Sequence, residues 1–180
     1  MLRSIMTFGV IAGIISALPS LWIILTPNLE HHSSMVIGMV VGYLAMLVAF
    51  SFIFVAIKRY RDNELGGVIK FLPAFGIGLA ITFVAGIFYV GVWDIYQHMT
   101  HFAFAEEWAP VVAKDALKNG ASPAEAARKA AEFKIHYLNP VWRWSTTFFE
   151  ELFPVGFLVS LVSAGLLRFR GFLPARGVAA

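Results

Sequence analysis

Five ionisable side chains lie beside the two apolar runs nearest the C-terminus, and their types could bind a cation or relay protons. Asp94, His98 and His101 are spaced i, i+4 and i+7, which places them on one face of a helix. Glu150 and Glu151 open the last apolar run. Carboxylates and imidazoles bind divalent transition metals such as zinc, and carboxyls at membrane depth can also pass protons. These five residues form a candidate polar or ion site, and the sequence leaves any metal unknown.

The same residues also fit a plainer interpretation, a hydrated polar belt at the membrane surface. Charges at the interface are inexpensive, whereas charges at the bilayer midplane are not. We therefore favour the belt, with one acid paired to Arg143 or to a tryptophan indole, over a functional acidic site, and that site over a metal site. The spacing is not the HExxH of a zinc protease. Asp94 and at least one glutamate should face the helix bundle, and if they meet they should share a proton.

The composition places the chain in the membrane class. Of its 180 residues 59% are apolar and only 14% are charged, against about 25% charged in a typical soluble domain. We predict an all-α polytopic protein that forms a single transmembrane domain over residues 1–180. Its four spanning helices should cover about 5–25, 35–57, 72–96 and 148–167, since each crossing needs about 20 residues.

The segment 98–145 is not apolar enough to span, and we predict that it forms an extracytoplasmic helical hairpin. Ser122 to Glu125 has the form of a capping box with Pro123 at the first helical position. A shorter helix is expected at Pro110–Lys118, with Gly120 placed to end it. Its aromatic residues should anchor the hairpin at the lipid headgroups. Glu30, His31 and His32, in the first loop, should lie on the same side.

Basic residues set the expected orientation. Arg3, the connector Lys58–Lys70 and the C-terminal tail hold eight of the fourteen Lys and Arg residues. Under the positive-inside rule both termini and the connector are cytoplasmic. The connector reads KRYRDNELGG from Lys58, and we interpret it as a turn that touches anionic lipid headgroups. Its basic residues are Lys58, Arg59, Arg61 and Lys70.

Small residues recur four apart in each apolar run. Close backbone approach over small residues is what lets helices pack in lipid. We therefore predict a compact bundle over a dedicated dimer face, although a second copy or another membrane protein remains a candidate partner. The pairs and rows are Gly9/Gly13, Gly38/Gly42, Ala74/Gly78/Thr82/Gly86 and Gly156/Ser160/Ala164.

Several other chemistries lack their signatures. The chain has no cysteine, which excludes disulfides and thiolate catalysis. It has no phosphate-binding Walker loop, no dinucleotide fingerprint and no nucleophile elbow. The basic connector lacks the interleaved aromatics that stack on bases. We expect no cofactor and no nucleic-acid partner, and the expected surroundings are the lipid bilayer.

Three segments resemble a known bacterial membrane family. They read AFSFIFVAIKRYRDNELGGVIKF, YVGVWDIY and FFEELFPVGFLVSLVSAGLLR, and they are similar to the family catalogued as domain of unknown function 4199. The resemblance covers nearly the whole chain, is most specific over Phe50–Phe71 and is weakest over Ala113–Lys134. It implies a four-helix protein of the bacterial inner membrane and implies no activity. In that family a glutamate often stands at the position of Asp94.

We carry three interpretations of function. The first is a non-enzymatic structural or accessory component of the bacterial inner membrane. The second is a small transporter, or a cation- or proton-binding protein, that uses the belt of Asp, Glu and His. An enzyme ranks last because no catalytic constellation is recognisable. A closed apolar bundle would favour the first interpretation, and a cavity that reaches toward the midplane would favour the second.

Overall fold

The computed structural model describes residues 1–25 and 35–175 and is all-helical over that part of the chain. The expected contacts of Glu30, His31 and His32 therefore lie outside the described residues. The elements in chain order are α1 Leu2–Leu25, α2 Met35–Glu64, α3 Phe71–Met99, α4 Ala103–Lys118, α5 Pro123–Leu138, α6 Pro140–Thr146, the π-helix η1 Thr147–Leu152 and α7 Phe153–Leu167.

Four helical stretches are long and apolar enough to cross a membrane. They are Leu2–Trp22, Gly38–Glu64, Phe71–Met99 and Pro140–Leu167. The last joins α6, η1 and α7 without a break, so the predicted start at Phe148 was wrong by eight residues. Pro140, Arg143 and the polar residues that follow hide this extension in the sequence, because a search for an apolar run ends at charged and polar residues.

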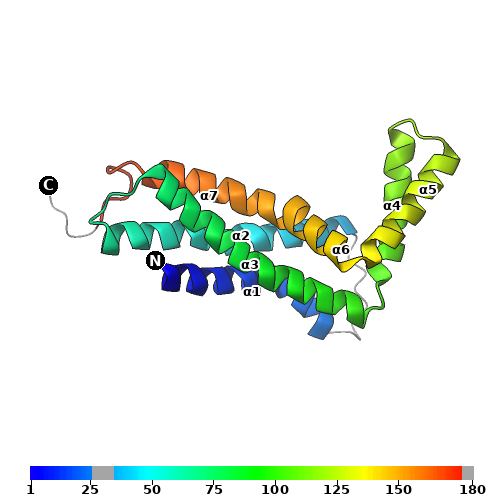
Figure 1. Cartoon of the computed structure of the whole chain (residues 1–180), viewed down its shortest axis with the longest axis horizontal. Helices are drawn as coiled ribbons and strands as arrows, with labels where there is room; N and C mark the ends of the chain where they lie inside the picture. Colours follow the sequence, from blue (N-terminus) through cyan, green and yellow to red (C-terminus); the bar gives the residue numbers. More distant parts are fainter. Residues whose placement is uncertain (26–34, 176–180) are drawn as a thin grey trace.

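Helix α3 packs against both α1 and α7, and α2 packs against α1 and α7 (Figure 1). Small residues make these approaches close. A Cβ added at Gly9 or Gly13 would collide with α3, and one added at Gly78 would collide with Ser160 of α7. These contacts confirm the expected role of those glycines, since backbones can meet only where side chains are small.

Three buried hydroxyl groups inside these helices are satisfied by the backbone of their own helix. Ser16 donates to the carbonyl of Gly13, Thr82 to that of Gly78, and Ser160 to that of Gly156. Such bonds to the preceding turn let a hydroxyl lie in an apolar interior without another partner. The exposed surface of the helices carries large apolar side chains instead, such as Leu72 and Ile87, which are suited to contact lipid.

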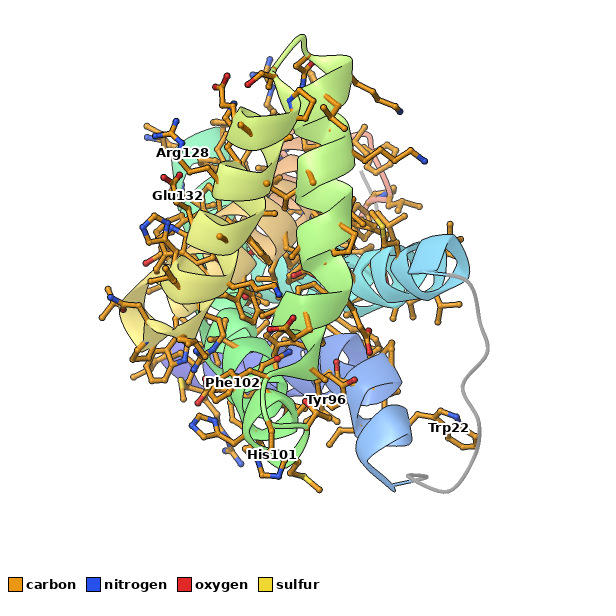
Figure 2. All side chains as sticks on the ribbon, turned by 90° about the vertical axis from the view of Figure 1, so that its right-hand side faces the viewer. Trp22, Tyr96, His101, Phe102, Arg128 and Glu132 are labelled. Atoms are coloured by element: carbon orange, nitrogen blue, oxygen red, sulfur yellow. The ribbon has the colours of Figure 1, made fainter. Side chains whose placement is uncertain are left out.

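Helices α4 and α5 pack side by side at one end of the long helices, across their direction (Figures 1 and 2). Ser122 accepts a hydrogen bond from the Glu125 amide at 3.2 Å, with Pro123 in the first turn, so the predicted cap is confirmed. Gly120 has a φ of 86° and follows the end of α4, as expected of a helix-ending glycine. The predicted start of α4 at Pro110 was wrong, because the helix begins at Ala103 and continues through that proline.

The charged connector is mostly helix and not a turn. Helix α2 continues to Glu64, and the change of direction is confined to residues 65–70, where Gly66 and Gly67 have positive φ angles. Lys58 forms an i, i+4 ion pair with Asp62, and Arg59 and Lys70 are exposed. The predicted end of the span at Ile57 was therefore short by seven residues, because ion pairing along the helix keeps the charged turns ordered.

Arg61 does not face lipid headgroups, as a basic connector would predict, but is fully buried. Its guanidinium donates to the carbonyl oxygens of Phe172 at 3.0 Å and Leu173 at 2.5 Å. Its Nε donates to Asp62 at 2.7 Å. Leu173 has a φ of 47°, a conformation that ordinary residues seldom adopt. Arg61 thus holds the segment after α7 against the end of α2.

We expect Gly156→Ala to destabilise the protein, because its new Cβ would lie within 3.0 Å of three side-chain atoms of Thr82. Overpacking of this kind typically costs about 1–3 kcal/mol. Thermal unfolding in detergent measures the loss. Gly165→Ala in the same helix is the matched control, since its Cβ would meet nothing within 4 Å and should leave the midpoint unchanged or higher. Equal midpoints for the two variants would contradict the packing.

We expect Arg61→Gln to lower the free energy of unfolding by about 1–3 kcal/mol, the typical cost of leaving buried hydrogen-bond acceptors without their donor. The loss arises because the carbonyls of Phe172 and Leu173 lose their donor. Arg59→Gln changes the same residue type on the exposed surface and should shift stability by less than about 0.5 kcal/mol. Similar unfolding midpoints for the two variants would show that Arg61 is not an anchor.

Candidate functional site

A cavity of about 510 Å³ lies where the ends of α1, α2 and α3 meet α4, α5, α6 and η1. Nineteen described residues line it, and of these nine are aromatic, two are acidic and none is basic. Its volume is within the range of about 300–1,000 Å³ that is typical of small-molecule sites. The cavity is therefore large enough to hold a small organic molecule.

Small residues of α1 and α2 form one side of this cavity. Ser16, Ser20, Gly38 and Gly42 line it, and a Cβ added at either glycine would meet no described residue within 4 Å. Gly38 and Gly42 therefore do not make the predicted close contact with another of the described helices. Glycine, the residue type that brings helix backbones together at Gly9 and Gly13, here leaves space unfilled.

Glu151 lies in the wall of the cavity and is held by a residue of the facing helix. The Tyr89 hydroxyl of α3 donates to Glu151 Oε1 at 2.5 Å. The second carboxylate oxygen, Oε2, accepts no hydrogen bond from the described residues. Glu150 also lines the cavity but is exposed. The candidate site thus has one positioned carboxylate and one free to move.

The π-helix that carries both glutamates has a cause in the sequence. Pro154 has no amide hydrogen, and the ring of a proline inside a helix clashes with the carbonyl four residues earlier. That carbonyl belongs to Glu150, within η1. The helix relieves the clash by widening over Thr147–Leu152, and such single-turn π segments often occur at functional sites. The widened turn directs Glu151 toward Tyr89.

Aromatic side chains from α3, α4 and α5 form a continuous wall opposite. The Trp93 ring lies 5.3 Å from that of Phe104, which lies 5.3 Å from Tyr137. The Trp93 indole donates to the Tyr137 hydroxyl at 2.9 Å. Burial raises the pKa of Tyr137 well above its usual range, so this hydroxyl stays neutral. The wall joins α3 to α4 and α5.

Asp94 turns away from the glutamates toward a separate partner, Arg143. Its Oδ1 accepts from Arg143 through Nε at 3.1 Å and through Nη2, and from the Trp144 indole at 2.9 Å. Arg143 is only 1% exposed and also donates to the Tyr137 carbonyl at 2.8 Å. The structure pairs this acid with both Arg143 and an indole, the partners expected for the polar belt.

The two histidines do not complete a metal site. His98 lies beside Asp94, its Nδ1 2.8 Å from the Asp94 carbonyl oxygen and 3.6 Å from a carboxylate oxygen. His101 is exposed and follows the end of α3 with a φ of 51°, at the lower edge of the view in Figure 2. It is therefore not on the predicted helix face, because α3 ends at Met99.

No three His, Asp or Glu side chains within residues 1–25 and 35–175 are grouped closely enough to hold a metal. The hydrogen bonds also separate the acids, with Asp94 on Arg143 and Glu151 on Tyr89. The structure thus does not bring the five predicted residues into one site. The glutamates belong to the cavity, and Asp94, with His98 next to it, belongs to the ion pair with Arg143.

Sequence reasoning did not single out Tyr89, Trp93, Phe104 or Gln97. It expected Trp108, Phe133, Tyr137, Trp142 and Trp144 to be anchors at the lipid headgroups, whereas the first four line the cavity. Gln97 is fully buried, and neither of its amide atoms has a partner within the described structure. Tyr89 and the wall residues look like ordinary apolar positions of their helices. One signal was present, since Pro154 three residues after Glu151 predicts a distorted turn there.

The comparison with family models gives one match. The model described as "Protein of unknown function (DUF4199)" matches residues 7–168, which is nearly the whole chain and includes every residue of the cavity. No match was found among curated proteins or solved structures.

We expect Asp94→Leu to destabilise the protein by about 3–5 kcal/mol, because it leaves the buried charge of Arg143 without its partner. Arg143→Leu should cost less, because Asp94 is partly exposed and keeps its hydrogen bond from the Trp144 indole. The double variant should lose clearly less than the sum of the two, since no uncompensated charge remains. Thermal or denaturant unfolding of the unmodified chain, the two single variants and the double variant gives the coupling energy between Asp94 and Arg143. Additive losses would show that the ion pair between α3 and α6 does not hold these helices together.

Proposed function

This chain belongs to the DUF4199 family, and we propose that it is a multi-pass membrane protein that binds a small organic molecule in the cavity at one end of its spanning helices. The observation that carries the proposal is the cavity itself, about 510 Å³ in volume and lined by Glu151 and nine aromatic side chains. Pockets of this kind, mostly apolar with a few polar groups, are the usual form of small-molecule sites.

The depth of the cavity supports binding over a purely structural role. It extends to Ser16 of α1 and to Tyr89 of α3. Ser16 lies nine residues before the end of its helix, or about 14 Å at 1.5 Å per residue. A carboxylate kept at such depth is expensive in lipid and is retained where it serves a ligand or an ion. A role in transport would use the same site.

The structural or accessory role remains the second candidate. It is supported by the other end of the molecule, where Arg61 and close glycine contacts join the helices tightly. A protein acting only as a scaffold has no use for an unfilled cavity beside Gly38 and Gly42. We therefore place the structural role at the packed end and ligand binding at the open end.

For location we propose the bacterial inner membrane, with both termini in the cytoplasm and α4 and α5 forming an extracytoplasmic helical hairpin. The positive-inside rule supports this orientation, because Arg59 and Lys70 at the α2–α3 turn and Arg168 and Arg170 after α7 are exposed at one end. The cavity then opens toward the outer side. Its ligand would arrive from outside the cell or from the outer leaflet.

We expect Ser20→Cys to react with a small membrane-impermeant thiosulfonate added outside intact spheroplasts, because Ser20 lines the cavity. The chain has no cysteine of its own, so every signal comes from the introduced residue. Ala127→Cys on α5 should react from the same side, and Asn63→Cys only after permeabilisation. Adding Gly42→Phe to Ser20→Cys should slow the reaction by filling the cavity.

Gly76→Phe is the matched control, since Gly76 is exposed on α3 outside the cavity and also has open space at its Cβ position. It should leave the reaction of Ser20→Cys unchanged. External labelling of Asn63→Cys would overturn the orientation. A Ser20→Cys protein that reacts from neither side would overturn the open cavity.

A further inference from the structure

We infer that the cavity is built for an organic cation, an amine, quaternary ammonium or phosphonium group carried on an apolar body. This inference rests on the proposed ligand-binding function and names its ligand class. The observation that carries it is the juxtaposition of a fixed carboxylate with aromatic faces in a space whose described lining residues include no basic side chain.

The charged side chains among the described lining residues are all acidic. Glu150 and Glu151 are its only charged side chains among the described lining residues. Arg143 packs behind the wall, 5.9 Å from the Tyr137 ring centroid, but its charge is paired with Asp94. A ligand with a positive charge would supply the missing partner, which lowers the cost of holding a carboxylate away from water.

The geometry at Glu151 leaves room for such a partner. Tyr89 holds Oε1 in place, whereas Oε2 receives no hydrogen bond from the described residues. Glu151 lies on the π-helix η1, and its carboxylate is already oriented by Tyr89. An acceptor that is already oriented loses less conformational entropy when a ligand binds. Glu150, exposed on the same turn, adds negative charge without occupying the space.

The aromatic wall suits a cation that carries an apolar body. Aromatic faces attract cations through the ring quadrupole, and cages of aromatic rings recognise quaternary ammonium groups. Trp93 and Tyr96 present rings 5.2 Å apart, with Trp108 and Phe104 stacked beside them. Rings linked in this way stay in place when the cavity fills, because each is packed against its neighbour.

Other ligand classes fit less well. An inorganic metal ion would need a group of ligands, and no such group forms among the described residues. An anion would meet two carboxylates and, among the described lining residues, no basic side chain. A neutral hydrophobe would leave Glu151 with the Tyr89 hydroxyl as its only hydrogen-bond partner among the described residues and would supply no opposite charge to it.

The test compares the cation tetraphenylphosphonium with the anion tetraphenylborate, which has nearly the same shape, and with the neutral triphenylphosphine oxide, in which an oxygen replaces one phenyl group. Binding is measured by titration calorimetry to the full chain in lipid nanodiscs, with Gly42→Phe nanodiscs supplying the background of partition into lipid. We expect saturable binding of the phosphonium alone. Glu151→Gln should weaken it about tenfold or more, since each tenfold change in Kd corresponds to about 1.4 kcal/mol.

Three further variants help to interpret the outcome. Gly76→Phe should bind the phosphonium as the unmodified chain does, and Glu150→Gln should weaken binding by less than Glu151→Gln. Unfolding midpoints identify any variant that fails to fold, and Tyr89→Phe provides a second way to disturb Glu151 without removing its charge. It should weaken binding by less than Glu151→Gln.

The outcomes separate this inference from the proposed function. Saturable binding of the borate or the oxide, but not the phosphonium, would overturn the cation while leaving a ligand site in the cavity. Phosphonium binding unaffected by Glu151→Gln would overturn the assigned partner. If no probe binds saturably, the cation inference is overturned, and the reaction of Ser20→Cys decides separately whether the cavity is open.

Discussion

A charged or polar group inside a membrane protein must find its partners within the protein, because hydrocarbon supplies none. Two buried arginines meet this constraint at opposite ends of the long helices. Arg61 places its donors on Asp62 and on the carbonyls of Phe172 and Leu173. Arg143 places its donors on Asp94 and on the Tyr137 carbonyl. Each guanidinium therefore ties a long helix to a segment far along the chain, and these ties position what lies between.

The position of the cavity depends on the second of these ties. With α6 held to α3 through Arg143 and Asp94, the helical stretch Pro140–Leu167 must cross the bundle from that point. Close glycine contacts between α3 and α7 fix its other half, where Gly78 meets Ser160 and Gly156 meets Thr82. The distorted turn between these fixed points has little freedom, and it is the turn that carries Glu151. The acid is held on both sides by contacts that are not themselves part of the cavity.

The four spanning stretches could be predicted from the sequence because apolar runs of about 20 residues are rare in helices that do not cross a membrane. Their ends could not, since α2 and the last span continue through charged residues that pair along the helix or within the bundle, such as Lys58 with Asp62. The sequence could name Arg143 as a partner for one of the acids, but not which acid, because the pairing with Asp94 joins residues 49 apart. A spacing of i, i+4 and i+7 also does not reveal that α3 ends at Met99.

The glycine pairs show most clearly what spacing leaves undetermined. Gly9/Gly13 and Gly38/Gly42 have the same four-residue interval, yet the first pair meets α3 closely and the second faces open space. The difference arises outside either pair. Opposite Gly38 and Gly42 the chain places Tyr89, held to Glu151, and the linked rings of Trp93 and Tyr96. Rings fixed by their own neighbours cannot move in to fill the gap, and a glycine has no side chain with which to close it. The cavity therefore stays open because the side chains that line it are held by contacts outside it. The ligand that it can bind is determined by Glu151, whose Oε2 accepts no hydrogen bond from the described residues.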